Sequence, residues 1–359
     1  MTTNNLIRIK DYEANAKKLL PKAAFEFFGE GTGHEDTLKN NLESYKRYRI
    51  RPRYLRNVEQ RTMRKKILGK DVAIPIGLSP TAIQKLAHKD GECAAAKAAE
   101  ELGTIYILSL HSTSTMEEVT QAAPKGRKWL QCYIFKVREV AQEIINTAER
   151  LGFEGIVLTV DFPVLGSRNI IAQYGHPLPY YLKKAILEKY LDSGIISNSA
   201  EVTDPSADWS CIKWLKSITK LPIIAKGILT AEDAILAVEA GVSAILVSNH
   251  GARQLDGVPS TIESLPEIVS AVGDKVEVYV DGGIRDGTDV FKALGLGAKM
   301  VFIGRPIVWG LFHNGEQGVK NVLTILRNEL DKAMAISGCA GLDDITKDKV
   351  IHESHYSKI

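Results

Sequence analysis

Cysteine is scarce in this chain of 359 residues, which has only Cys93, Cys132, Cys211 and Cys339, all far apart in sequence. No Cys-x-x-Cys pair occurs, which argues against a zinc site and against a disulfide framework. Unpaired thiols are typical of proteins from a reducing intracellular compartment. The sequence therefore predicts no metal site and no disulfide scaffold.

Long apolar runs and a strong charge bias are also missing. The N-terminus MTTNNLIRIKDYE has no apolar signal core, and the longest apolar runs cover only a few residues, so we expect neither a leader nor a membrane span. The net charge of +3 is too small to indicate nucleic acid as a partner. We interpret the basic stretches 45–56 and 61–66 as solvated surface.

Eight apolar segments rich in β-branched residues recur along the chain after residue 70. They lie at 72–80, 105–110, 128–134, 155–161, 221–228, 244–250, 276–283 and 299–306. Each is nearly continuous rather than alternating, as expected for parallel strands that are buried on both faces. Helix-like segments separate them, and in one of these, 230–241, Thr230 is the expected N-cap and Gly241 the expected end.

Eight strand–helix units in a chain of this length predict an α/β fold, a (β/α)8 TIM barrel. A doubly wound sheet is the alternative, but no Gly-x-Gly-x-x-Gly motif follows the first strand. We expect one domain over 1–359, with the barrel at 71–340 and a C-terminal tail at 341–359. Residues 1–70 are expected to form an N-terminal helical segment, and its 9–31 part is an amphipathic pair divided by Pro21.

The segment from about 167 to 207, between the fourth and fifth strands, does not fit the repeat. It is polar, rich in tyrosine and proline, and too long for an ordinary connection between a strand and a helix. Long loops at this end of a barrel are typically lids or binding loops. We therefore expect a lid-like loop here.

Polar side chains gather where the predicted strands end, which is the face on which such barrels carry their chemistry. Residues i and i+2 of a strand point the same way, so three polar pairs are expected to face one side. The pairs are Gln131 with Tyr133, Thr159 with Asp161, and Ser248 with His250. Polar groups in apolar strands are costly unless they are satisfied, so these pairs, together with Lys226, predict a functional site.

Two motifs, DGGIR at 281–285 and IGRP at 303–306, follow the last two strands, where barrels commonly bind a phosphate. Glycine lets backbone N–H groups approach phosphate oxygens, and Arg285 and Arg305 add positive charge. Each motif alone also fits a tight turn that needs glycine for a positive φ. Both together, in register with the strand count, favour a phosphorylated cofactor.

The loop SNHGARQLDG at 248–257 supplies two reactive groups of the predicted site, His250 and Arg253, and other strand ends supply the rest. His250 is the expected base, and Asp161 would orient it and stabilise its charge. Arg168 and Arg253 are suited to grip a carboxylate. Lys226 could stabilise negative charge that develops on a heteroaromatic ring.

Taken together, these motifs resemble the FMN-dependent 2-hydroxy acid oxidases. The resemblance rests on SNHGARQLDG, PTA at 80–82, LTVDFPVLGSR at 158–168, AKGI at 225–228, DGGIRDGTDVFKALGLGA at 281–298 and IGRP. It spans almost the whole chain and is strongest to the peroxisomal 2-hydroxyacid oxidases of animals and to plant glycolate oxidase. It implies that FMN oxidises an (S)-2-hydroxy acid to the 2-oxo acid and that dioxygen reoxidises the flavin to give hydrogen peroxide.

The resemblance also implies a role for each matching residue. Those implied to act on the substrate are His250 as the base, Asp161 as its partner, Tyr133 at the hydroxyl, and Arg168 and Arg253 at the carboxylate. Those implied to surround the isoalloxazine ring are Pro80, Thr81, Ala82, Ser109, Gln131, Thr159, Lys226 and Ser248. Those implied to hold the ribityl phosphate are Asp281, Gly282, Gly283, Arg285, Gly304 and Arg305.

Three positions bear on substrate and electron acceptor within the family. Phe27 stands where the short-chain oxidases have a substrate-binding tyrosine, and His111 replaces a tryptophan of the glycolate type. Both residues are expected to line the substrate pocket, which predicts a substrate larger than glycolate. Ala82, in place of glycine, favours an oxidase over a dehydrogenase.

Alternative functions follow from single features. Lys226 at the end of the fifth strand would suit a Schiff-base aldolase, but that leaves His250 and Arg253 without roles. A dehydrogenase with another electron acceptor, or a catalytically weak flavoprotein, would keep the same fold.

The resemblance further implies a homotetramer, and the final Ser357, Lys358 and Ile359 resemble a peroxisomal address.

Overall fold

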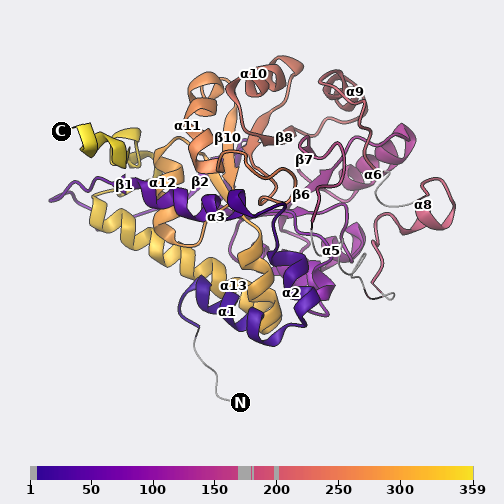
Figure 1. The fold of residues 1–359 in the computed structure, drawn as a ribbon, viewed down its shortest axis with the longest axis horizontal. Helices are drawn as coiled ribbons and strands as arrows, with labels where there is room; N and C mark the ends of the chain where they lie inside the picture. Colours follow the sequence, from indigo (N-terminus) through magenta and orange to yellow (C-terminus); the bar gives the residue numbers. More distant parts are fainter. Residues whose placement is uncertain (1–5, 169–178, 180–181, 198–201, 359) are drawn as a thin grey trace.

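A closed barrel of eight parallel strands forms the centre of the molecule (Figure 1). The structure is a computed structural model, and it describes residues 6–168, 179, 182–197 and 202–358. The strands are β4 (Ile76–Leu78), β5 (Ile105–Leu108), β6 (Arg127–Cys132), β7 (Ile156–Thr159), β8 (Ile223–Ile228), β9 (Ala244–Val247), β10 (Glu277–Asp281) and β11 (Met300–Ile303). All eight coincide with predicted segments, which confirms the predicted (β/α)8 barrel.

Helices surround the barrel and connect its strands (Figure 1). They are α4 (Gly91–Glu101), α5 (Met116–Ala122), α6 (Arg138–Arg150), α8 (Glu188–Asp192), α9 (Ser210–Ile218), α10 (Ala231–Ala240), α11 (Thr261–Val272), α12 (Gly287–Gly295) and α13 (Arg305–Ser337). In α10 the Thr230 hydroxyl accepts a hydrogen bond from the backbone N–H of Asp233, and Gly241 ends the helix with φ +99°. Both predicted ends of this helix are therefore confirmed. None of the helices in the described part of the chain is long and apolar enough to cross a bilayer.

Large apolar side chains fill the barrel interior. Trp129 of β6 packs against Tyr279 of β10 and Phe302 of β11, with ring centroids 5.9 and 5.8 Å away. A hairpin of β2 (Lys65–Ile67) and β3 (Lys70–Val72) contributes Ile67 and Val72 to the same cluster. The interior of the barrel is thus a packed core.

The N-terminal helices form a layer outside the barrel. α1 (Ile9–Leu19) and α2 (Lys22–Gly29) flank Pro21, as predicted, and both pack against α13 (Figure 1). α3 (Asp36–Glu43) and the 3₁₀ helix η1 (Ser44–Arg47) follow. From residue 48 the chain contains short strands instead of the helix expected up to residue 70. β1 (Tyr48–Ile50) pairs with β12 (Val350–His352), so the C-terminal tail is built into the fold.

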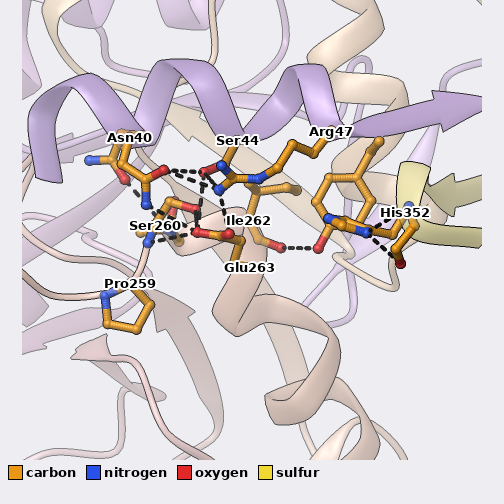
Figure 2. Close-up of polar contacts among 12 residues, drawn as sticks. Asn40, Ser44, Arg47, Pro259, Ser260, Ile262, Glu263 and His352 are labelled. Carbon is orange, nitrogen blue, oxygen red and sulfur yellow. Dashed lines mark hydrogen bonds and ion pairs between the residues drawn. The ribbon is translucent and has the colours of Figure 1, made fainter. Parts of the chain in front are cut away.

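Glu263 in the first turn of α11 fastens this layer to the barrel, as Figure 2 shows. Its carboxylate accepts hydrogen bonds from Asn40 Nδ2 at 3.1 Å, Ser44 Oγ at 3.1 Å and Ser260 Oγ at 2.6 Å, and it pairs with Arg47. Burial opposes ionisation, but these hydrogen bonds and the charge of Arg47 hold the pKa of Glu263 below its usual value. The attachment fixes α3 above the mouth of the barrel.

Gly283 shows how closely α3 approaches the loop after β10. Its φ is +78°, and a Cβ atom at this position would lie 1.9 Å from the backbone oxygen of Asn41. The glycines of the DGGIR motif were predicted to admit phosphate oxygens, but at Gly283 the packing of α3 already requires glycine.

We predict that Gly283→Ala destabilises the protein far more than Gly152→Ala. Gly152 has nearly the same φ, +76°, but a Cβ atom there would meet nothing within 4 Å. The control therefore carries only left-handed strain of about 1–2 kcal/mol, whereas Gly283→Ala adds overpacking of about 1–3 kcal/mol. The urea concentration at the midpoint of unfolding measures the stability of both variants. Equal losses of stability would contradict the packing role of Gly283.

Candidate active site

One cavity of about 220 Å³ opens at the carboxyl ends of the barrel strands and collects nearly all the predicted site residues. Its lining includes Phe27, Pro80, Thr81, Ala82, Ser109, His111, Gln131, Tyr133, Thr159, Arg168, Lys226, His250, Arg253, Asp281, Gly282, Gly283, Arg285, Gly304 and Arg305. Asp161 and Ser248 are not part of the lining. They lie behind it, hydrogen-bonded to residues that are.

His250 and Asp161 form a half-buried pair at the mouth, with 23% and 15% of their side chains exposed. His250 Nδ1 lies 2.9 Å from Asp161 Oδ1. Burial would raise the pKa of Asp161, but His250 and Lys226 hold it below its usual value, so this carboxylate is ionised. It therefore accepts the Nδ1 proton of His250 and leaves the lone pair on Nε2.

The backbone around His250 is held in a rare conformation. Its φ is +57°, in the left-handed region, and its N–H donates to Ser248 Oγ at 3.1 Å. Burial lowers the pKa of His250, and the charge of Asp161 only partly offsets this. The imidazole is thus neutral near pH 7, which is the form that a base requires.

Lys226 and Asp281 form a second pair across the barrel mouth, and this one is buried. Lys226 Nζ donates to Ser248 Oγ at 3.0 Å and lies 4.0 Å from Asp281 Oδ2. Ser79 Oγ donates to the same carboxylate oxygen at 3.0 Å. Asp281 Oδ1 is buried without a hydrogen-bond partner among the described residues, so it is an acceptor ready for a ligand hydroxyl.

Polar groups of three adjacent strands are linked, as their strand positions predicted. Gln131 Nε2 donates to Thr159 Oγ1 at 3.0 Å, and Gln131 Oε1 accepts from Leu110 N at 3.1 Å. Ser109 Oγ also lies 3.4 Å from Gln131 Oε1. These contacts hold a row of amide and hydroxyl groups that can bond the polar edge of a ring.

Arg168 and Arg253 converge on Phe27, which links the N-terminal layer to the site. Their guanidinium carbons lie 5.3 and 5.6 Å from the Phe27 ring centroid, and Nη1 of each donates to the Phe27 carbonyl, at 3.3 and 2.7 Å. Burial, followed by the nearby charges of Arg168 and Arg305, depresses the pKa of Arg253 strongly. Like charges buried together favour an anionic ligand between them.

Arg285 and Arg305, the two arginines predicted to hold a phosphate, differ in how many of their N–H donors are already hydrogen-bonded. Arg305 donates to the backbone oxygens of Phe28, Glu30 and Gly251, and burial lowers its pKa to about 10. Arg285 Nε is buried with no hydrogen-bond partner among the described residues and lies 3.7 Å from Glu13 Oε2. Arg285 is therefore the more available donor for an anion.

Sequence reasoning missed Gln254, Phe162 and Lys184. Gln254 Nε2 donates to the backbone oxygens of Asp161 and Val164, so it joins the loop after β9 to the loop after β7. Phe162 and Lys184 line the cavity. Gln254 directly follows Arg253, but a glutamine in a polar loop gives no distinct signal. Lys184 lies in the segment 167–207, of which residues 169–178, 180, 181 and 198–201 lie outside the described residues.

Comparison with known proteins places this geometry in context. Residues 16–352 match the family model described as FMN-dependent dehydrogenase. The chain is 48% identical to human 2-hydroxyacid oxidase 1 and 47% identical to glycolate oxidase 1 of Oryza sativa subsp. indica, with 95% of both chains covered in each comparison. Its structure matches mandelate oxidase with (S)-2-phenylpropionate, with a TM-score of 0.88 and 37% identity over 95% of this chain and 97% of the other. It also matches a soluble mutant of the membrane-associated (S)-mandelate dehydrogenase from Pseudomonas putida, with a TM-score of 0.91 and 31% identity over 97% and 100%.

Proposed function

Because the chain belongs to the FMN-dependent dehydrogenase family, we propose that it oxidises an (S)-2-hydroxy acid to the 2-oxo acid and passes the electrons to dioxygen, giving hydrogen peroxide. The observation that carries the proposal is the half-buried His250–Asp161 pair at the same cavity mouth as the neighbouring cations of Arg168 and Arg253. A base beside a carboxylate grip is what abstraction of a proton from a 2-hydroxy acid requires.

The cavity residues fit FMN. Asp281 Oδ1 is a buried acceptor without a partner among the described residues, which suits a ribityl hydroxyl, and Arg285 Nε is a buried donor that suits a phosphate oxygen. Gly304 lies at the N-terminal end of α13, where backbone N–H groups favour an anion. Gln131, Thr159 and Lys226 offer donors and acceptors to the isoalloxazine ring.

FMN, when bound, supplies the oxidant, since its ring accepts the two electrons that the substrate loses. Arg168 and Arg253 hold the substrate carboxylate and so fix which face of the substrate meets the ring. His250 Nε2 takes a proton from the substrate, and Asp161 stabilises the imidazolium that results. Tyr133, whose pKa is raised by burial, stays protonated and can donate to the substrate hydroxyl region.

The substrate is larger than glycolate in this proposal, which Phe27 and His111 support. We expect (S)-2-hydroxyhexanoate to exceed glycolate in kcat/KM by about tenfold or more, because one methylene in an apolar pocket is worth about 1–3 kcal/mol. The rate of hydrogen peroxide release in air measures kcat/KM for both substrates. A clear preference for glycolate would refute the size proposal, and flavin that is reduced by substrate but reoxidised slowly in air would favour a dehydrogenase.

Assembly and location are part of the same proposal. Tyr54 and Leu55 are large apolar side chains that are 72% and 104% exposed, which supports burial between copies in a homotetramer. Light scattering tests this, and a mass near 39.5 kDa would contradict it.

Ser357 is exposed at the end of the chain, as a peroxisomal address requires. If removal of residues 357–359 left a fluorescent fusion in peroxisomes, the proposed address would be wrong.

A further inference from the structure

Two pairs of side chains at the cavity mouth each take one member from each of two loops. The loop after β7 carries Asp161 and Arg168, and the loop after β9 carries His250 and Arg253. The base therefore meets its carboxylate partner only if the two loops keep a fixed position relative to each other, and the same holds for the two arginines. Any contact that fixes this position also fixes the geometry of the proposed reaction.

Gln254 bonds the two loops through its whole side-chain amide. Its Nε2 donates to the backbone oxygen of Asp161 at 2.8 Å and to that of Val164 at 3.0 Å, and its Oε1 accepts from the backbone N–H of Gly166 at 3.0 Å. All three bonds cross from the loop after β9 to the loop after β7. Both Nε2 protons are used in this way, so the amide has no N–H left for a substrate.

The three bonds lie where they act on both pairs. One holds the backbone of Asp161 itself, and the carboxylate Oδ1 of this residue lies 2.9 Å from His250 Nδ1. Another holds Gly166, which stands two residues before Arg168. A shift of the loop after β7 would therefore displace the partner of the base and one arginine of the carboxylate grip together.

Gly166 shows how closely the two loops fit beside these bonds. A Cβ atom at this position would clash with the backbone oxygen of Arg253 and would lie 2.9 Å from the Cα atom of Gln254. The loops thus approach each other backbone to backbone, and only glycine leaves room for the approach. Packing of this closeness gives the loops little freedom to slide.

We propose that Gln254 is a positioning residue that sets the geometry of both pairs without touching the substrate. The inference rests on the proposed function and deepens it, because it names the residue that holds the base and the carboxylate grip in register. Its effect on the rate must therefore pass through Asp161, and its effect on substrate binding must pass through Arg168.

Gln254→Met tests the proposal, because methionine has a similar length but cannot make the three hydrogen bonds. We expect kcat for (S)-2-hydroxyhexanoate to fall about ten- to a hundredfold, as for a small misplacement of reacting groups, and KM to rise as well. In an Asp161→Asn background the same substitution should lower kcat little further, since the two residues act as a unit. The rise in KM should persist there, because Arg168 is still displaced. Stopped-flow flavin reduction measures the chemical step.

The pH profile adds a readout that a loss of stability alone would not move. Burial lowers the pKa of His250 most, Asp161 raises it, and Lys226 and Arg253 lower it further. When Gln254→Met loosens Asp161, the contribution that raises this pKa weakens. The acid limb of kcat/KM should therefore move to lower pH, in the same direction as for Asp161→Asn.

Two further variants control the experiment. Gly166→Ala disturbs the same contact from the other loop, so it should reproduce the loss in kcat and the shift of the acid limb. Gln317→Met is the matched control, because Gln317 is an exposed glutamine of α13 that donates to Asn321 at 2.8 Å and does not line the cavity. It should leave kcat, KM and the pH profile unchanged.

The outcomes separate this inference from the proposed function. An unchanged kcat in Gln254→Met, or a loss that is equally large in the Asp161→Asn background, would overturn the positioning role. Loss of bound FMN in both Gln254→Met and Gly166→Ala would also overturn it, since the contact would then support the fold and not the site. An unmodified enzyme whose flavin no 2-hydroxy acid reduces would instead overturn the proposed function.

Discussion

His250→Gln lowers kcat by about 10²- to 10⁴-fold, the range that a positioned general base contributes. Glutamine fills a similar space and can still accept a hydrogen bond, but it cannot take up a proton. KM should change little, because Arg168 and Arg253 remain in place. Stopped-flow measurement of flavin reduction isolates the chemical step from reoxidation by dioxygen.

The control for this substitution is His313→Gln, since His313 is exposed on α13 and does not line the cavity. It should keep the flavin spectrum and kcat of the unmodified enzyme. If His250→Gln with FMN bound reduced its flavin at the normal rate, another group would have to be the base.

The pH profile provides an independent check on the same pair. Burial holds the pKa of His250 below its ordinary value of 6.5, and the base must be neutral, so kcat/KM should fall only at pH values below 6.5. Asp161→Asn removes the negative charge that favours protonation, so the acid limb should move to still lower pH while the rate decreases. An acid limb at or above 6.5 would contradict the burial of a neutral imidazole.

Arg253→Met should lower kcat/KM by about 30- to 5,000-fold, since removing one partner of a buried, hydrogen-bonded charge pair costs about 2–5 kcal/mol. The effect should lie mainly in KM, because the carboxylate is held in the ground state as well as in the transition state. Arg253→Lys should recover only part of the loss, since an ammonium group cannot present the planar fork of a guanidinium.

Arg138→Met is the matched control, because Arg138 pairs with Asp204 at 3.1 Å and does not line the cavity. Steady-state kinetics with (S)-2-hydroxyhexanoate would show the split between kcat and KM. An Arg253→Met variant with an unchanged KM would place the substrate carboxylate elsewhere.

The strands and the site could be predicted from the sequence because parallel barrels give direct signals. Nearly continuous apolar runs marked all eight strands, and the fold itself brings the strand ends together at one mouth. Residues as distant as Gln131 and Thr159 could therefore be placed side by side from their positions alone.

What could not be predicted depends on contacts between distant, locally unremarkable residues. The carboxylate of Asp256 accepts backbone hydrogen bonds from His34 and Thr37 at 2.9 and 2.8 Å, and these lower its pKa to about 2. This contact joins the N-terminal layer to the loop that carries His250. Phe27 was expected only as a pocket wall, yet its carbonyl also holds both arginines, which no local pattern reveals.

The most direct test is the visible spectrum of the purified protein before and after (S)-2-hydroxyhexanoate is added without oxygen. The proposed function predicts a yellow flavin spectrum that bleaches on addition of the substrate and returns, with release of hydrogen peroxide, when air is admitted. A colourless protein that takes up no added FMN, or a bound flavin that no 2-hydroxy acid reduces, would contradict it.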